Sequence, residues 1–413
     1  MVEIMIRDTD IVITGIGTVS PYGYGTKTYW DGLANGEDKI TEVKKIKVDN
    51  NYAKRGGEID WYIPQNFFSK NELGKWDLNT QYCMLAMEEA KLEAKIDAFP
   101  NNTGIFMGTL TAGLPFAEMY YDNMLKNKYI PRYITQCFRA SVADNIAKKY
   151  HLIGPKITVT TACSASAHAI AVGVSYLRRN KIEVAIVGGV DAFCQVTWAG
   201  FSALRALSAV QISPFSKERQ GTQIGEGAGV LVLETYKRAK ARNAKIYAII
   251  AGCGSSTDAY HITAPNPTGE TQAQAIRAAI SDANVKLSDI DVICAHGTGT
   301  ELNDQMESKM IKKVFGKHYM KPSVTSIKSM IGHTMGAAGI HLTIALIGMM
   351  RNRKIFPTIN YQNMDEEGDL SIVTNHSITK DINLGLVNAF GFGGNNAALV
   401  LANPVYKENE IHD

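Results

Sequence analysis

The feature that most constrains the fold of this chain is the stretch 156–170, KITVTTACSASAHAI. Its first part is rich in β-branched residues, which favour a strand, and its second part holds small residues that suit a helix. Cys163 lies at the junction. A thiol at a helix N-terminus meets unpaired N–H groups and the positive end of the helix dipole. That setting can lower a thiol pKa from about 8.5 to about 3.5–7.5. The stretch alone leaves two interpretations open, a nucleophile and a buried structural cysteine.

Composition excludes several classes of protein. The formal charge of +3 over 413 residues is too small to indicate nucleic-acid binding. No apolar run reaches the ~18 residues of a membrane span, and residues 1–10 lack the layout of a signal peptide. The six cysteines are scattered without a CxxC pair, which argues against a zinc site and a disulfide framework. We therefore expect a cytoplasmic protein with reduced thiols and no bound metal.

Strand and helix patterns alternate along the chain, which indicates a layered α/β protein. Three stretches of the first part resemble three of the second: 10–20 and 247–257, 156–168 and 322–338, and 185–193 and 386–394. In each pair a strand leads into a glycine turn or a small-residue helix. This weak repeat predicts two similar halves, residues 1–245 and 246–413, whose strand ends converge on one site.

Three segments of the second half could carry chemistry. AHGTGT at 295–300 places His296 after an apolar strand, and KSMIGHTMGAAG at 328–339 contains Lys328 and His333. NAFGFGGNN at 388–396 is a glycine turn with Phe392. Glycines beside a histidine let the backbone and a ligand approach closely. A cysteine with two such histidines meets the requirement for a nucleophile with acid/base or oxyanion-stabilising groups. The other histidines lack this setting, and we expect His168 to be a packing residue.

Five motifs give the chain a family resemblance over nearly its whole length. They are TACSAS at 161–166, GEGAG at 225–229, AHGTGTELND at 295–304, KSMIGH at 328–333 and NAFGFGG at 388–394. In this order they resemble the β-ketoacyl-acyl-carrier-protein synthases of the elongating type, which condense acyl chains in fatty-acid and polyketide synthesis. The resemblance implies the thiolase fold, with two pseudo-repeated α/β halves in five layers.

The resemblance also implies a role for each motif residue. Cys163 matches the nucleophile that takes the acyl chain from acyl carrier protein. His296 and His333 match the pair that drives decarboxylation of the malonyl carrier thioester, and Lys328 matches the lysine that supports the site, paired with an acid at Glu307. Phe392 matches a gating phenylalanine, and its N–H would form an oxyanion hole with that of Cys163. Thr298 and Thr300 match threonines that hydrogen-bond the pantetheine arm of the substrate. The reaction implied needs no redox cofactor or metal, because loss of CO2 drives it.

The implied partners are an acyl carrier protein, docked through basic residues such as Arg205, and a second subunit paired along residues 157–161. That subunit is an identical chain, or a related chain-length subunit as in type II polyketide synthesis. The sequence departs from the family at 213–216, which reads SPFS where Arg-Pro-Phe-Asp is usual. This departure favours a specialised pathway. Two further alternatives, a thiolase and a non-catalytic chain-length subunit, are disfavoured: no cysteine follows Cys294, and the Cys-His-His set is complete.

Overall fold

The computed structural model describes residues 6–48, 51–365 and 368–404. Among these residues, eleven strands form one continuous sheet. Five of its strands come from the first half of the chain: β1 (Ile11–Ser20), β5 (Gly104–Gly108), β6 (Lys156–Val159), β7 (Val184–Asp191) and β8 (Gly227–Thr235). Five come from the second half: β9 (Ala248–Thr257), β10 (Val292–Cys294), β11 (Ser323–Thr325), β14 (Leu384–Gly391) and β15 (Asn395–Ala402). The short β2 (Gly23–Tyr24) pairs with β1.

The two sets of strands have the same order and the same directions. The first runs β1-β8-β7-β5-β6 and the second β9-β15-β14-β10-β11, with two antiparallel pairings followed by two parallel ones in each. β1 and β9 join the sets through an antiparallel pairing over Ile11–Ile13. The three sequence pairs of the repeat contain β1 and β9, β6 and β11, and β7 and β14, which occupy equivalent places. The domain boundary at residue 245 stays a prediction.

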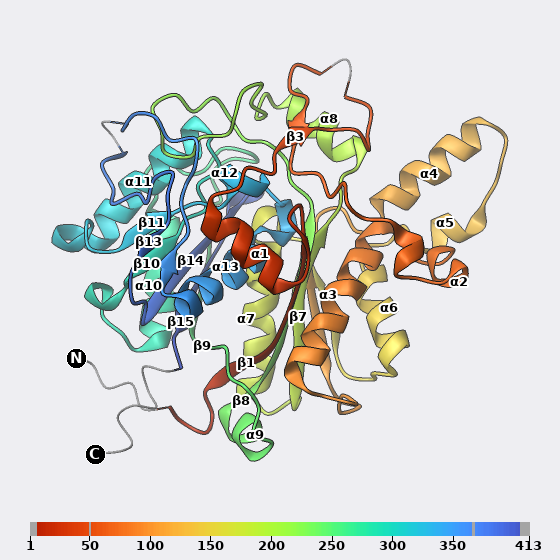
Figure 1. Cartoon of the computed structure of the whole chain (residues 1–413), viewed down its shortest axis with the longest axis horizontal. Helices are drawn as coiled ribbons and strands as arrows, with labels where there is room; N and C mark the ends of the chain where they lie inside the picture. The colour runs from red at the N-terminus through yellow and green to blue at the C-terminus, as the bar shows by residue number, and fades with distance from the viewer. Residues whose placement is uncertain (1–5, 49–50, 366–367, 405–413) are drawn as a thin grey trace.

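Helices cover both faces of each set and complete five layers (Figure 1). α3 (Leu78–Ala94) packs on the outer face of β1 and β8, and α10 (Glu270–Ala283) packs in the equivalent place on β9 and β15. α7 (Ala165–Arg178) and α13 (Ala338–Asn352) contact each other and form the middle layer. α11 (Glu301–Phe315) lies beside α10. The thiolase-like arrangement predicted from the motifs is therefore present.

Paired glycines explain why the outer helices sit so close to the sheet. A Cβ built on Gly17 would lie 1.9 Å from the Ala86 carbonyl oxygen of α3, and a Cβ on Gly254 would lie 2.0 Å from the Ala275 carbonyl oxygen of α10. Both positions belong to the G-x-G of the first strand in their half. Only glycine permits this backbone approach. The turns predicted at these glycines are wrong, because Gly17 and Gly254 lie inside β1 and β9 and allow the outer helices to pack closely.

The strand before Cys163 differs from its prediction. The β-branched residues of 157–161 would suit a strand that is buried on both faces, but β6 ends at Val159 and is half-buried, with Lys156 exposed. The reason is its place in the topology, because β6 is the last strand of the sheet. Its outer edge has no neighbouring strand among the described residues.

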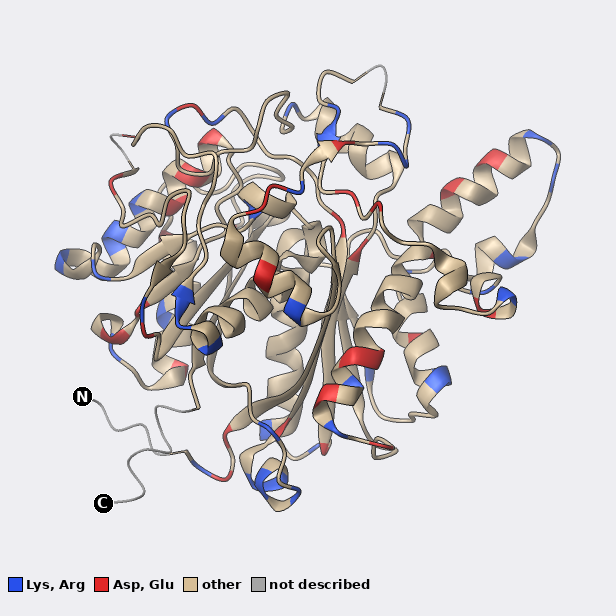
Figure 2. Ribbon diagram, viewed as in Figure 1, with Lys and Arg blue, Asp and Glu red and all other residues tan. Residues whose placement is uncertain are grey.

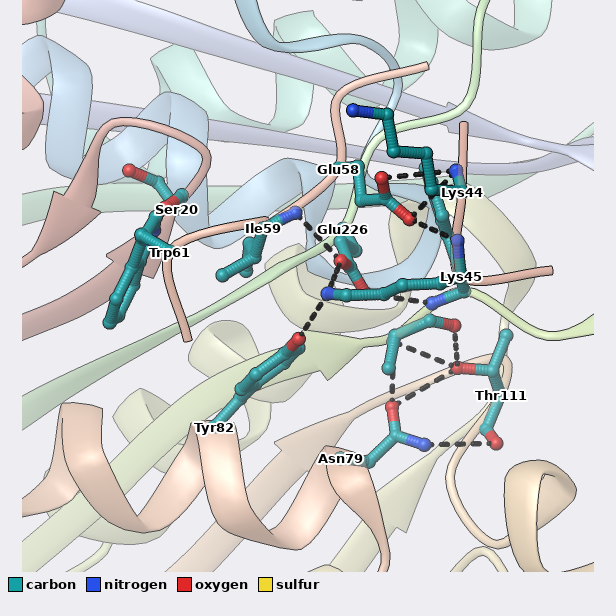
Figure 3. Close-up of polar contacts among 12 residues, drawn as sticks. Ser20, Lys44, Lys45, Glu58, Ile59, Trp61, Asn79, Tyr82, Thr111 and Glu226 are labelled. Carbon is teal, nitrogen blue, oxygen red and sulfur yellow. Dashed lines mark hydrogen bonds and ion pairs between the residues drawn. The ribbon is translucent and has the colours of Figure 1, made fainter. Parts of the chain in front are cut away.

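The lysine-rich segment 39–55, predicted to be a surface excursion, is fastened to the body by two buried carboxylates. Glu58 accepts the Lys45 N–H at 2.6 Å. Glu226, in the GEGAG motif, accepts the Ile59 N–H at 2.7 Å, the Phe193 N–H at 3.0 Å and the Lys45 ammonium (Figure 3). The apolar side chains of the segment, Val43, Val48 and Ala53, are buried. The described part of the excursion is thus hydrogen-bonded to the body and packs against α8 (Gln195–Ala203).

No described helix has both the length and the apolar character that crossing a membrane requires. The described residues also contain no group of three His, Cys, Asp or Glu side chains placed to bind a metal ion.

Candidate active site

Cys163 lies in a tight turn between β6 and α7. The turn is a short 3₁₀ segment, Ala162–Ser164, and the α-helix begins only at Ala165. Ala162 has a φ of 49°, in the left-handed region that non-glycine residues rarely occupy. The Ser164 hydroxyl donates to the Thr161 carbonyl at 2.8 Å and so closes the turn. This geometry buries the thiol, which is 4% exposed.

The thiol pKa differs from the prediction made for a helix N-terminus. Burial raises the pKa of Cys163 to about 11, although the charge of Lys328 and the backbone N–H groups of Phe392 and Cys163 itself lower it. Loss of water disfavours the thiolate more than these donors favour it. The prediction of a lowered pKa is therefore wrong for the resting state. The oxyanion hole expected from these two N–H groups stays a prediction.

His296 and His333 face each other from two loops of the second half. His296 follows β10, and His333 follows α12 (Lys328–Ile331). The ring centroids are 5.4 Å apart with the planes nearly perpendicular. Burial, reinforced by the charge of Lys328, holds the pKa of both histidines well below the ordinary value. Both rings are therefore neutral near pH 7, and each can donate one N–H to an oxygen in the site.

The backbone around His333 fixes which ring nitrogen carries the proton. The Met335 N–H donates to His333 Nδ1 at 3.3 Å, so the proton of the neutral ring lies on Nε2. The main chain of His333 is held on both sides, by Gln223 O at 2.7 Å and by Gly225 N at 3.0 Å. A Cβ on Gly225 would lie 2.2 Å from the Ile331 carbonyl oxygen. The GEGAG motif thus seats the histidine loop against β8.

Lys328 and Glu307 hold the His296 loop from opposite sides. Glu307 accepts the N–H groups of His296 and Gly297, both at 2.8 Å, and the Lys328 ammonium donates to the His296 carbonyl. The two side chains bind the same peptide segment, and the pairing predicted for them stays a prediction. Burial lowers the pKa of Lys328 to about 8 while Glu307 raises it. The lysine therefore still carries most of its charge at neutral pH.

Phe392 lies on a turn that glycines make possible. Gly393 and Gly394 have φ values of 78° and 77°, which favour glycine. The Phe392 ring stacks on Phe201 of α8, with centroids 5.7 Å apart and an angle of 28° between the planes. The ring predicted to act as a gate thus contacts a second aromatic residue, on the side of the excursion and α8.

These side chains line one pocket of about 360 Å³. Its lining includes Cys163, His296, His333 and Phe392, together with Thr298, Thr300 and, at an exposed position, Arg205. The hydroxyls of Thr298 and Thr300 are 2.8 Å apart. Lys328 and Glu307 lie behind the His296 loop and do not line the pocket. The structure therefore brings the predicted residues together: one group lines the pocket, and Lys328 and Glu307 lie behind it.

Sequence reasoning missed several supporting residues. Asp304 accepts the N–H groups of Thr298 at 3.1 Å and Phe215 at 2.8 Å, which ties the unusual SPFS segment to the threonine loop. Asn388 donates to Glu307 at 3.0 Å. His168, treated as a packing residue, places Nδ1 3.1 Å from the Ser164 carbonyl oxygen and supports the cysteine turn. Asp304 and Asn388 were visible as polar residues beside apolar strands or inside the motifs, which is the signal that could have found them.

The fold and this site define a class, the thiolase-fold enzymes with a cysteine nucleophile in one half and a histidine pair in the other. Within that class, the sequence models of the β-ketoacyl synthase N-terminal and C-terminal domains match residues 8–239 and 247–362. The chain belongs to the β-ketoacyl synthase family.

Characterised relatives agree with this assignment. The chain is 34% identical to 3-oxoacyl-[acyl-carrier-protein] synthase 2 of Staphylococcus aureus (strain COL), over 96% of this chain and 99% of the relative. It is also 34% identical to the protein of that name in Coxiella burnetii, over 95% and 98%. Among solved structures, the ishigamide ketosynthase/chain length factor superposes with a TM-score of 0.90 at 32% identity, over 95% and 99%. A type II PKS ketosynthase in complex with its acyl-carrier protein gives 0.88 at 28% identity, with the same coverage.

Proposed function

We propose that this enzyme catalyses the decarboxylative Claisen condensation of a Cys163-bound acyl chain with a malonyl carrier thioester, giving a β-ketoacyl carrier thioester and CO2. The observation that carries the proposal is the single pocket into which Cys163, His296 and His333 all open. A thiol suits covalent acyl transfer, and two neutral N–H donors suit an enolate.

In the acylation step, the Cys163 sulfur attacks the thioester carbonyl of the acyl carrier. A carbon–sulfur bond to Cys163 forms, and the oxyanion lies in the N–H groups of Cys163 and Phe392 that face the thiol. The bond to the pantetheine sulfur then breaks, and that sulfur leaves with the proton that the Cys163 thiol gave up. Lys328 supports this step because its charge favours the transient thiolate.

In the condensation step, the malonyl thioester loses CO2 and the electron pair of the broken bond becomes an enolate. Its oxygen accepts N–H bonds from His296 and His333, whose charge would not change. The enolate carbon attacks the Cys163 thioester, the new carbon–carbon bond forms and the sulfur of Cys163 leaves as a thiolate, which takes up a proton from water to restore the thiol. Burial of both rings strengthens these hydrogen bonds, because few waters compete for the oxyanion.

The test uses purified enzyme with acyl and malonyl carrier thioesters, CO2 release and mass spectrometry of the carrier. We expect a carrier-bound β-ketoacyl product with wild-type enzyme and none with Cys163→Ala. Product formation at equal rates by both proteins, or no product with any acyl chain length, would contradict the proposal.

We infer that acyl carrier protein docks at the mouth of the pocket. Arg205 is exposed there, and lysines and arginines also lie along the excursion beside α8 (Figure 2). Carrier proteins present acidic helices, so complementary charge would guide the encounter. Thr298 and Thr300 would bind the pantetheine arm inside.

We further propose that the enzyme acts as a dimer in the cytoplasm. The free edge of β6 would pair with its counterpart in a second subunit, which removes an exposed edge. α4 (Leu114–Leu125) and α5 (Pro131–Thr135) project from the body (Figure 1). Large apolar side chains are exposed on these helices, between them and just after α5: Met119, Tyr121, Leu125, Tyr129, Ile134 and Phe138. A second subunit would cover this surface and place residues near the acyl end of the pocket. The six cysteines, all free, agree with a reducing compartment.

A pathway in type II polyketide synthesis, with a chain-length subunit as the partner, is the second candidate. The likeness to the ishigamide ketosynthase/chain length factor favours it. Expression of the chain alone, followed by light scattering and the condensation assay, separates the candidates. An active homodimer supports a fatty-acid enzyme. An inactive chain rescued by a related subunit supports the polyketide enzyme, and an active monomer contradicts both.

A further inference from the structure

A buried carboxylate that the mechanism above does not use lies at the end of β7. Asp191 has no exposed surface. Its Oδ1 accepts the Thr109 hydroxyl at 2.8 Å, the Thr111 N–H at 2.7 Å and the Thr111 hydroxyl at 2.9 Å. The Leu110 N–H lies 2.9 Å from Oδ1 and 3.1 Å from Oδ2. These donors all belong to the loop after β5, in the first half of the chain.

One donor comes from the other half. The Gly336 N–H, in the turn that follows His333, donates to Asp191 Oδ2 at 2.6 Å. A Cβ on Gly336 would lie 2.8 Å from that oxygen, so the residue must be glycine for the N–H to reach it. Asp191 thus links the two halves by hydrogen bonds, and its partner in the second half, Gly336, lies three residues after His333.

The hydrogen bond between Asp191 and Gly336 affects the His333 ring through Met335, the residue before Gly336. Met335 donates its N–H to His333 Nδ1 and has a φ of 51°, a left-handed value that costs energy for a residue with a side chain. A strained turn keeps its conformation only where surrounding contacts impose it. The charged hydrogen bond from Gly336 to Asp191 is such a contact, because hydrogen bonds to a carboxylate are about twice as strong as neutral ones.

The partners of the carboxylate are also fixed in place. The Thr111 hydroxyl also lies 3.1 Å from Asn79 Oδ1, and the Asn79 amide donates to the Thr111 carbonyl at 3.2 Å (Figure 3). Asn79 Oδ1 in turn accepts the Ala192 N–H at 2.8 Å, directly after Asp191. The groups of the first half that surround Asp191 are therefore held by further hydrogen bonds, and through Asp191 they can fix the turn that follows His333.

We propose that Asp191 is a positioning residue for His333: by holding the Gly336 N–H it keeps the Met335 N–H on Nδ1 and so keeps the imidazole proton on Nε2, where the enolate would bind. This role rests on the function proposed for His333. Burial raises the pKa of Asp191 to about 6, so the carboxylate is charged at neutral pH, as the bridge requires.

The test compares Asp191→Asn, which replaces a carboxylate oxygen by an amide, with Thr109→Val, which removes a donor on the first-half side and leaves the Gly336 bond. For Asp191→Asn we expect CO2 release from malonyl carrier to fall ~10- to 100-fold in kcat. KM and the rate of Cys163 acylation should stay within threefold. Thr109→Val should keep both rates. Nitrogen chemical shifts of labelled histidine should show His333 protonated on Nε2 in wild type and a mixture of tautomers in Asp191→Asn.

A second variant, Gly336→Ala, breaks the bridge from the other side and keeps the carboxylate. It should reproduce the loss of CO2 release, and it decides the matter if Asp191→Asn does not fold. The proposal is overturned if the folded variants release CO2 at the wild-type rate, or if acylation falls as much as decarboxylation. If His333→Ala itself releases CO2 normally, the function proposed for His333 fails first, which is a distinguishable result.

Discussion

The two halves of the molecule share a topology and differ in what their equivalent loops bury. The loop after β6 buries Cys163, and the loop after the equivalent strand β11 buries Lys328 and His333. The loop after β5 supplies donors to Asp191, whereas that after β10 supplies His296. Both sets of loops open at the same ends of parallel strands, where ligands bind in α/β sheets. One backbone plan therefore buries a thiol in one half and two histidines in the other, which suits the acyl acceptor and the enolate site that we propose.

The largest effect should follow removal of the thiol. Cys163→Ala eliminates the acyl acceptor, so condensation should fall about 10⁴-fold or more. CO2 release from malonyl carrier should continue, because the histidine half is untouched. Product analysis and CO2 trapping measure the two activities separately. Simultaneous loss of CO2 release in a folded variant would mean that the halves do not divide the reaction.

The reciprocal change should affect the other activity. His296→Ala or His333→Ala removes one enolate donor, and we expect CO2 release to drop about 10²- to 10³-fold. Acyl transfer to Cys163, followed by mass spectrometry of its peptide, should stay within tenfold of wild type. His341→Ala is a control, since this buried histidine of α13 does not line the pocket. Normal CO2 release by either site variant would reject the role.

Thiol alkylation can measure how the charge of Lys328, in the second half, affects the Cys163 thiol in the first half. A thiol of pKa about 11 should react with iodoacetamide faster as the pH rises from 7 to 9, because the thiolate fraction rises with pH below the pKa. The rise should be less than tenfold for each pH unit, because Lys328 loses its charge over the same range. Lys328→Met should slow the reaction about tenfold at pH 7, since loss of the cation raises the Cys163 pKa further.

The lysine effect should fade as pH rises. Lys328 has a pKa of about 8, so its charge disappears above that pH and the two proteins should converge near pH 10. A wild-type rate that is flat above pH 7 would instead indicate a thiol with a depressed pKa, as the sequence predicted.

Opening the gate should have a moderate effect. Phe392→Ala removes the ring that stacks on Phe201, so acyl and malonyl carriers should compete more equally for the pocket. We expect the ratio of the two kcat/KM values to change about fivefold to tenfold. Phe201→Leu, which keeps the gate ring and changes its stacking surface, is a matched comparison and should give a smaller change. An unaltered ratio in Phe392→Ala would contradict gating.

The smallest effect should come from the surface. Arg205→Glu should raise KM for carrier substrates about threefold to tenfold at low salt and less at high salt. Arg179→Glu is the control, because Arg179 is exposed at the far end of α7 from Cys163. Equal effects of the two variants, or no salt dependence, would argue against docking at Arg205.

Local pattern was enough to predict much of this architecture. The small-residue stretch after Cys163 became α7, as the sequence predicted. The Cys163 pKa could not be predicted, because it depends on burial in the folded chain and on residues far along the sequence, such as Lys328 and Phe392. Asp191 reads as a turn residue after glycines, and only the approach of Gly336 makes it a bridge. The exposed edge of β6 likewise depends on strand order, which a single strand does not encode.

The central claim, that the first half holds the acyl chain and the second half discharges it, has one direct test. The double variant His296→Ala/His333→Ala is loaded from an acyl carrier thioester and then mixed with malonyl carrier, and the mass of its Cys163 peptide is followed over time. We predict that the variant acquires the acyl group and keeps it, whereas wild type acquires and loses it. A double variant that discharges at the wild-type rate, or that never becomes acylated although folded, would contradict the account.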